Sequence, residues 1–159
     1  MNIYDLFAAI EAMDPVILGG AVLATTAIFA IGALAGLLRY LLTAIGYSKM
    51  YRKAGVAGWK AFIPVYNTYN NYKISWNGKL FFLFAALFAV ASLLGESPEG
   101  VMALIGIAVN IGVIFLMIKQ NIKMAKRFGK GAGTGIALIF FPGITSLILG
   151  LGKAAFIAE

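Results

Sequence analysis

Long apolar runs separated by polar segments predict that this chain is an all-α polytopic membrane protein with four transmembrane helices. The four helices are expected at 15–45, 80–95, 98–128 and 134–151. A helix needs roughly 20 apolar residues to cross about 30 Å of hydrocarbon, so the short second run must borrow flanking residues or be re-entrant. Asp14 and Pro15 suit the first turn of a helix, whereas Pro142 and Gly143 should kink or break the last one.

The segments between the apolar runs carry helical patterns of their own. Apolar residues recur at helical spacing within 1–14, which predicts a short amphipathic helix on the outer surface. In the connector 46–79, Pro64 should separate two short amphipathic helices, because the residue before a proline disfavours helical backbone. The third helix is expected to project into the cytoplasm beyond Ile118, and 152–159 is expected to be a short outer tail.

Charge is segregated between the two sides of this pattern. Twelve of the 13 Lys and Arg residues fall on one side and all 6 Asp and Glu residues fall on the other, with Lys153 as the exception. Cytoplasmic loops retain positive charge during insertion, so both termini are expected outside and the connector 46–79 inside. The expected location is the bacterial cytoplasmic (inner) membrane.

Composition supports the membrane-protein class and excludes several kinds of chemical site. The chain is 62% hydrophobic and 12% charged, against about 25% charged residues in a soluble domain. It has no Cys and no His, which excludes disulfides, thiolate catalysis and imidazole metal ligands, and no cofactor or metal is expected. The positive charges border apolar spans, so anionic lipid headgroups are the expected partners and nucleic acid is not.

The connector 46–79 interleaves aromatic and basic side chains, which are the residue types that settle at a membrane interface. It is interpreted as an aromatic belt on the inner leaflet or as a binding surface for a lipid, a peptide or a partner protein. Its asparagines could coordinate a headgroup or satisfy loop backbone groups. With two cations beside the glycine-rich turn 129–135, the candidate binding residues are Lys53, Trp59, Lys60, Tyr66, Asn67, Asn70, Asn71, Trp76, Arg127 and Lys130. That turn is either a flexible connection or a site for a lipid phosphate.

Small and polar residues inside the apolar runs are candidates for helix packing. These residues are Gly32, Gly36, Asn110, Pro142 and Gly143. Asn110 is interpreted as a hydrogen-bonding residue between helices or as an ion ligand, and the small residues fit either one bundle or a homo-oligomer. No charged residue lies near the centre of a run, which argues against a proton-coupled pump.

Three blocks in order along the chain carry a family resemblance. They are KAGVAGWKAFIPVYN at 53–67, AKRFGKG at 125–131 followed by the Phe141-Pro142 break, and LGLG at 149–152. Together they resemble a family of small bacterial multi-pass membrane proteins of unknown function, some of which are labelled signal peptidase I-like. Ala57 departs from the proline expected in the family pattern. The resemblance implies a membrane fold and supplies no established reaction.

Two functions from different classes fit these observations. The first is a non-enzymatic scaffold or accessory subunit, possessing a basic aromatic cytoplasmic face that binds lipid headgroups or a partner in a larger membrane complex. The alternative is a small oligomeric channel or transporter that uses the broken last helix and Asn110. A Ser/Lys peptidase would depend on Ser97 and Lys153, and it is disfavoured because the chain has no soluble domain to build a substrate cleft.

Overall fold

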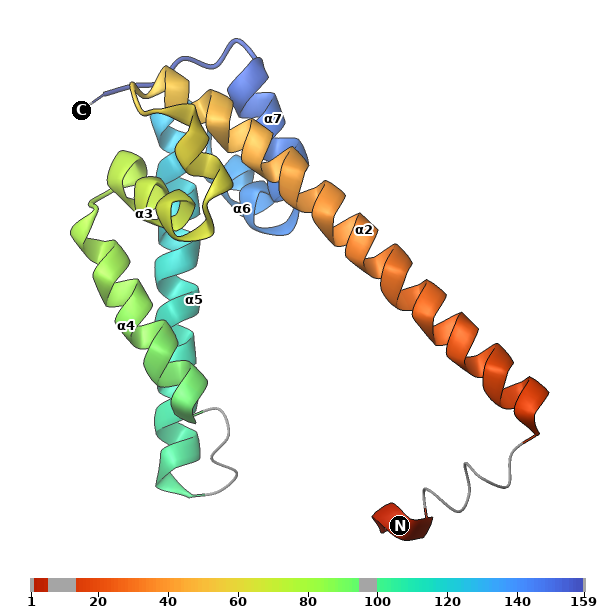
Figure 1. The fold of residues 1–159 in the computed structure, drawn as a ribbon. Coiled ribbons are helices and arrows are strands. Elements are labelled where there is room, and N and C mark those ends of the chain that lie inside the picture. Colours follow the sequence, from red (N-terminus) through yellow and green to blue (C-terminus); the bar gives the residue numbers. More distant parts are fainter. Residues whose placement is uncertain (1, 6–13, 95–99, 159) are drawn as a thin grey trace. The chain divides into compact units, whose positions relative to one another are not determined.

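The computed structural model describes residues 2–5, 14–94 and 100–158, and the chain is helical without strands over these ranges. In chain order the elements are α2 (Pro15–Lys53), the 3₁₀ helix η1 (Gly58–Phe62), α3 (Pro64–Ser75), α4 (Lys79–Leu94), α5 (Val101–Arg127), α6 (Ala132–Phe140) and α7 (Pro142–Leu151) (Figure 1). The chain divides into an N-terminal unit, 1–39, and a C-terminal unit, 40–159.

The N-terminal unit contains the first part of α2. The helix begins as predicted, with the Val16 amide donating to the Asp14 carboxylate over 2.7 Å and Pro15 in the first turn. Side chains along this part of α2 are exposed, apart from the half-buried Leu18. The amphipathic helix expected within 1–14 falls largely on residues 6–13, which lie outside the described residues.

Helix α2 continues to Lys53, eight residues past the expected end of the first transmembrane segment at residue 45. The added turns are buried in the C-terminal unit, where Tyr47, Met50 and Tyr51 join its core. Gly55 follows with a φ of 73°, a backbone conformation that favours glycine and ends the helix. Pro64 separates η1 from α3 as predicted, and Ile63 before it is extended.

The core of the C-terminal unit gathers side chains from almost every one of its helices. It comprises Tyr47, Met50, Tyr51, Ala61, Ile74, Met124, Phe128, Leu138 and Leu149. These residues come from the last turns of α2, from η1 and α3, from the end of α5 and its cap, and from α6 and α7. The core therefore lies at the end of this unit that holds the C-terminus of α5.

Helices α4 and α5 form an antiparallel pair. A Cβ added at Gly106 would lie 3.5 Å from Leu94, and one at Gly112 would lie 3.7 Å from Leu87. Later residues of α5 thus contact earlier residues of α4. Helix α5 begins at Val101, and the residues 98 and 99 at its expected start lie outside the described residues.

The expected fourth crossing at 134–151 is instead a helical hairpin. Phe141 is non-helical, with φ −126° and ψ 56°, and Pro142 begins a new helix because proline lacks the amide that would continue α6. The hydroxyl of Thr145 in α7 donates to the Ala137 carbonyl of α6 over 3.1 Å. Helices of 9 and 10 residues rise about 14 and 15 Å, roughly half of a bilayer's hydrocarbon.

The tail after α7 was expected at the end of the molecule opposite the connector 46–79, and the structure places it elsewhere. The Ile157 amide donates to the Arg127 carbonyl at the end of α5 over 2.7 Å, and the rings of Phe156 and Phe128 lie 5.6 Å apart. The tail therefore returns to the end of the C-terminal unit that holds the core and the C-terminus of α5. The hairpin makes this return possible because its two helices begin and end near the same level.

Packing between α7 and the last turns of α2 has a specific physical basis. A Cβ on Gly150 would lie 2.6 Å from the Gly46 carbonyl oxygen, and one on Gly46 would lie 2.7 Å from the Leu147 amide nitrogen. Ser146 is fully buried and its hydroxyl donates to the Gly143 carbonyl over 3.1 Å. Glycine and serine thus let the two backbones approach closely.

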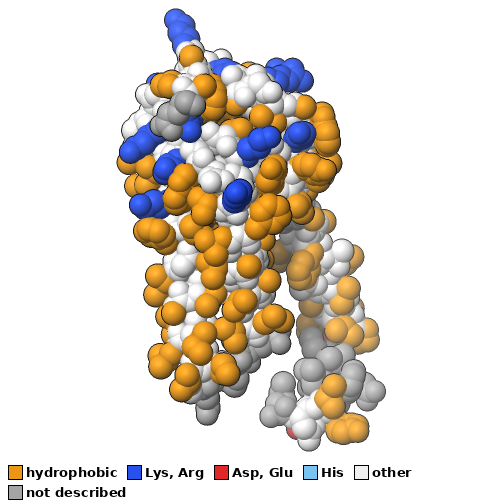
Figure 2. All heavy atoms as spheres, turned by 90° about the vertical axis from the view of Figure 1, so that its left-hand side faces the viewer, with side chains coloured by type: hydrophobic (Ala, Val, Ile, Leu, Met, Phe, Trp, Pro, Cys, Tyr) orange, Lys and Arg blue, Asp and Glu red, His pale blue; other side chains and the backbone are white. Residues whose placement is uncertain are grey.

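Two described helices are long and apolar enough to cross a membrane, α2 and α5. Helices α4 and α7 are apolar but shorter. Figure 2 shows Lys and Arg side chains gathered at one end of the C-terminal unit, with hydrophobic side chains covering the helices that lead away from it.

Candidate functional site: a basic hollow beside α5

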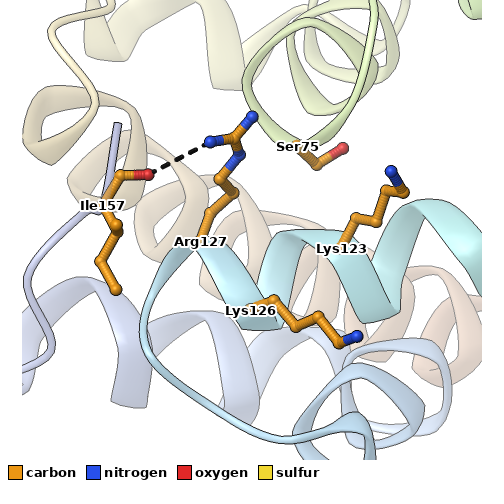
Figure 3. A pocket seen from close by; sticks show the side chains of 5 residues that line it. All are labelled: Ser75, Lys123, Lys126, Arg127 and Ile157. Atoms are coloured by element: carbon orange, nitrogen blue, oxygen red, sulfur yellow. Dashed lines mark hydrogen bonds between the residues drawn. The ribbon is translucent and has the colours of Figure 1, made fainter. Parts of the chain in front are cut away.

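A hollow of about 240 Å³ opens where the end of α3, the last turns of α5 and the C-terminal tail meet. We call it the basic hollow; it is lined by Ser75, Lys123, Lys126, Arg127 and Ile157 (Figure 3). The three cations come from α5, where spacings of three and four residues place them on one side of the helix. One water molecule needs only about 10–15 Å³ of such space, so the hollow has room for a larger group.

Its cations are held by neighbouring elements. The Lys123 ammonium lies 4.6 Å from the centre of the Trp76 ring, in the position of a cation–π contact. The Arg127 guanidinium donates to the Ile157 carbonyl over 3.5 Å, and Figure 3 shows it directed between Ile157 and Ser75. The tail and the segment after α3 therefore position two of the three cations.

The charged side chains that line the hollow are all positive. Asp and Glu occur in the C-terminal unit only at positions 96, 99 and 159, so its described residues contain no carboxylate side chain. Like charges three and four residues apart on a helix repel one another, so Lys123 and Lys126 repel each other on this face of α5.

A buried polar chain leads from the hollow into the core. The Gln120 amide donates to the Ser75 hydroxyl over 3.4 Å, and that hydroxyl donates to the Asn71 carbonyl. On the same helix the side-chain oxygens of Asn67 and Asn71 accept from the Tyr51 hydroxyl, over 2.8 Å in the case of Asn71. The hydrogen of Ser75 is thus already used, and Ser75 forms a fixed wall of the hollow.

The three candidate asparagines are placed by these contacts. Asn67 and Asn71 are half-buried beside Tyr51, and Asn71 also donates to the Asn67 side-chain oxygen over 3.3 Å. Asn70 is buried and donates to the Tyr66 carbonyl over 2.6 Å. Their amides therefore serve the packing of α3 against α2 and the backbone of α3 itself.

The aromatic candidates lie apart from the asparagines. Trp59 and Tyr66 are exposed and their ring centres lie 5.8 Å apart. Trp76 contacts the basic hollow through Lys123. Lys60 is half-buried and Lys130 is exposed, and neither lines the hollow.

Lys53 has a structural position. Its ammonium donates to the Leu149, Gly152 and Ala154 carbonyls over 2.8, 2.7 and 2.9 Å. An ammonium has three N–H donors, so all of them meet carbonyls at the end of α7 and the start of the tail. This arrangement holds the returning tail against α2.

The packing candidates fall into two groups. A Cβ on Gly32 or Gly36 would meet no atom within 4 Å, whereas one on Gly143 would lie 3.4 Å from the Thr43 hydroxyl. Pro142 stands in the first turn of α7. The Asn110 amide donates to the Gly106 carbonyl of its own helix over 2.9 Å, which satisfies a polar group on an apolar face.

Sequence reasoning missed four residues of the hollow, which are Ser75, Lys123, Lys126 and Ile157. Lys123 and Lys126 could have been found from their spacing with Arg127 along one face of α5. Ser75 carries no such signal, because only the fold brings the end of α3 beside the end of α5. The expectation that Ser97 and Lys153 do not form a peptidase site stays a prediction, since Ser97 lies outside the described residues.

Comparisons with known proteins support one part of the resemblance, membership of a family of unknown function. The model of a family of unknown function, DUF5684, matches residues 59–159, which include α3 to α7 and every residue of the basic hollow. No curated protein and no solved structure matches the chain. Since the family match covers well over half of its residues, this chain belongs to the family of unknown function DUF5684.

Proposed function

We propose that this chain is a multi-pass protein of the bacterial inner membrane that acts without catalysis, as a scaffold or accessory subunit with a basic end that binds anionic lipid headgroups. The observation that carries the proposal is the charge of the C-terminal unit. Twelve Lys and Arg residues lie between residues 40 and 158, and no described residue there is acidic. Each Lys or Arg near an anionic leaflet contributes about 1 kcal/mol of attraction.

Exposed apolar helices support the membrane part of the proposal. Phe82, Leu93 and Leu104 are 65%, 78% and 67% exposed on α4 and α5, where water would make such exposure costly. Crossing by α2, α4 and α5 would leave the α6–α7 hairpin to enter the membrane from the basic side. Its tip, Phe140 and Phe141, is apolar and exposed, and its length suits one leaflet.

Thiol labelling tests this topology cleanly, because the chain has no cysteine of its own. We expect a membrane-impermeant maleimide to label Asn2→Cys in intact cells, and to label Arg52→Cys and Lys153→Cys only after permeabilisation. The matched pair is Arg52 and Lys153, which were predicted from the sequence to lie on opposite sides. Labelling of Lys153→Cys in intact cells would support four crossings and reject the re-entrant hairpin.

Lipid analysis of the purified particle tests the functional part. The protein is extracted gently, and the phospholipids that remain bound are compared with those of the source membrane, while native mass measurement gives the protein subunits. We expect enrichment of anionic lipids and a second subunit, either another copy or a partner protein. A lone chain that retains lipids in the proportions of the membrane would refute both the scaffold and the headgroup preference.

The broken α6–α7 hairpin supports a second candidate, a small channel or transporter, because interrupted helices recur in transporters. Flux through proteoliposomes separates the two proposals. The scaffold predicts no flux of ions or small solutes above that of empty vesicles. Flux that is lost on Asn110→Leu substitution would favour the channel.

A further inference from the structure

We infer that a groove between α3 and α4 binds one acyl chain of an anionic phospholipid, with the phosphate at the basic end of the C-terminal unit. The groove, which we call the aromatic groove, has a volume of about 290 Å³. It is lined by the start of α3, including Val65 and Thr68, and by Phe81, Phe84, Ala85 and Phe88 of α4. The inference rests on the proposed membrane function and deepens it by naming the lipid and its site.

The lining of the aromatic groove suits hydrocarbon. Among its described lining residues only Thr68 has a polar side chain, and the Thr68 hydroxyl donates to the Pro64 carbonyl over 3.0 Å. The hydrogen of that hydroxyl is therefore already used. One water molecule needs about 10–15 Å³ and two to four polar partners, so the groove has room for a larger group but binds water poorly.

Contacts with α3 hold the phenylalanine rings that form the wall on α4. The Phe81 ring lies edge-on to Tyr69 with the ring centres 5.7 Å apart, and the Phe84 ring centre lies 5.5 Å from that of Tyr72. Phe88 stacks on Phe84 with the ring centres 6.1 Å apart. Aromatic pairs attract one another at such distances, so the groove exists before a ligand arrives and binding costs less conformational entropy.

Polarity changes along the groove in the order found in an anionic phospholipid. Helix α4 begins at Lys79, whose amide donates to the Asn77 side chain over 2.9 Å, and the groove follows from Phe81 to Phe88. These residues span about 10 Å of the helix axis, against about 15 Å for the hydrocarbon of one leaflet. Figure 2 shows Lys and Arg side chains at one end of this unit and hydrophobic side chains along the helices that leave it. An acyl chain that lies along α4 thus places its headgroup at the basic end.

The cations next to the groove match the charge of a lipid phosphodiester. Lys60 lies in η1 just before α3, and Lys79 lies at the start of α4. Residues 58–94 are all described and contain no acidic side chain. A lipid such as phosphatidylglycerol carries a single negative charge, so one lysine is enough to neutralise it and both attract it.

Bulky walls favour an acyl chain over a helix of a second copy. Transmembrane helices approach closely where small residues line the contact, as Gly46 and Gly150 do between α2 and α7. The wall on α4 is mostly phenylalanine, and Phe88 and Val65 are 57% and 65% exposed. A flexible chain can follow the spaces between such rings, whereas a rigid helix cannot.

Lipid retention in detergent tests the inference. The full chain is purified in an uncharged detergent, mixed with equal amounts of phosphatidylglycerol and phosphatidylcholine, and separated from unbound lipid by size-exclusion chromatography. Native mass spectrometry then counts the phospholipids on each chain. We expect one tightly held phosphatidylglycerol per chain.

Filling the groove should remove that lipid. Ala85→Phe adds a ring to the wall on α4, and we expect retention to fall by roughly tenfold or more. Ala86→Phe is the matched control, since Ala86 is exposed and does not line the groove, and retention should change by less than about twofold. Val65→Trp fills the groove from α3 and guards against a folding artefact, because Val65 is exposed and the unfolding midpoint should stay unchanged while retention falls.

The headgroup preference is tested by charge. Lys60→Gln with Lys79→Gln should lower the retained ratio of phosphatidylglycerol to phosphatidylcholine by about fivefold or more. The control, Lys119→Gln with Lys153→Gln, removes the same charge from residues that do not border the groove and should change the ratio by less than about twofold.

The inference is overturned if the parent chain retains no phospholipid, if Ala85→Phe retains as much as Ala86→Phe, or if the two lipids are retained equally. A dimer that Ala85→Phe dissociates would overturn it in favour of a second copy in the groove. Failure of the membrane proposal is distinguishable, because it would appear in the labelling of Lys153→Cys. Failure of this inference alone would leave that labelling as expected.

Discussion

Side chains at the basic end of the C-terminal unit are buried against one another, whereas side chains along the apolar stretches of its helices are exposed. At the basic end, Met50, Tyr51 and Met124 are fully buried in protein and polar groups are bonded to one another. Along α4 and the first half of α5, large apolar side chains such as Leu93 and Leu104 remain exposed. The difference indicates that tertiary packing stabilises the basic end, whereas the apolar stretches need an apolar environment around them.

The largest effect should come from enlarging a glycine at the basic end. Gly46→Leu would place its Cβ 2.7 Å from the Leu147 backbone amide, so α7 must move away from α2. We expect a loss of at least about 3 kcal/mol of stability, or no folded protein. The measurement is the thermal midpoint in detergent, followed by size-exclusion chromatography.

Gly36→Leu is the matched control, because it lies on the same helix and its added Cβ meets no atom within 4 Å. We expect little change in the midpoint. A loss as large as that of Gly46→Leu would show that close backbone approach at Gly46 is not the cause of the effect, and would reveal a partner for the exposed part of α2.

A smaller loss should follow removal of the Tyr51 hydroxyl. Tyr51→Phe leaves the side-chain oxygens of Asn67 and Asn71 without their shared donor in a half-buried place. We expect a loss of about 1–3 kcal/mol in the free energy of unfolding. Tyr66→Phe serves as the control because Tyr66 is exposed, and equal losses for the two variants would show that the polar chain adds nothing.

Releasing the tail should have a more modest effect. Lys53→Met keeps an apolar stem but removes the donors to the Leu149, Gly152 and Ala154 carbonyls. We expect a loss of about 1 kcal/mol, since the ammonium is only half-buried and solvent screens it, and faster digestion of the tail by carboxypeptidase. Lys153→Met should leave digestion unchanged, and protection of the tail in Lys53→Met would refute its role as a tether.

The smallest effect should have the opposite sign. Tyr72 is 2% exposed and its hydroxyl is buried without a hydrogen-bond partner among the described residues. Tyr72→Phe removes that polar group and keeps the ring against Phe84, so the midpoint should rise by the equivalent of up to about 1 kcal/mol. A fall in the midpoint would mean that the hydroxyl has a partner.

Ionisation of Tyr72 should also make the stability of the fold depend on pH in alkaline solution. Burial raises the pKa of Tyr72 from 10.0 to about 12. The unfolded chain therefore releases the Tyr72 proton at a lower pH than the folded chain. Ionisation of Tyr72 consequently leaves the free energy of unfolding unchanged below pH 10 and lowers it as pH rises toward 12. Tyr72→Phe should lose less stability than the parent over this interval, as measured by the unfolding midpoint.

Proline marked the starts of helices correctly from sequence because its effect is local. Pro15, Pro64 and Pro142 each begin a helix, and each does so through its own ring and missing amide. The end of α2 escaped prediction because Gly46 reads as a helix breaker in isolation. In the fold its missing side chain is what lets α7 pack against the helix, and the helix continues.

The sequence alone determined the helical class, the apolar runs and the break at Pro142, since each depends on composition or on neighbours along the chain. Tertiary structure decided that the tail returns beside Arg127 and that Ser75 meets Lys123, Lys126 and Arg127. These contacts join segments some 30 to 50 residues apart, and they depend on close backbone approach at glycines and on hydrogen bonds between elements, which no periodicity in the sequence encodes.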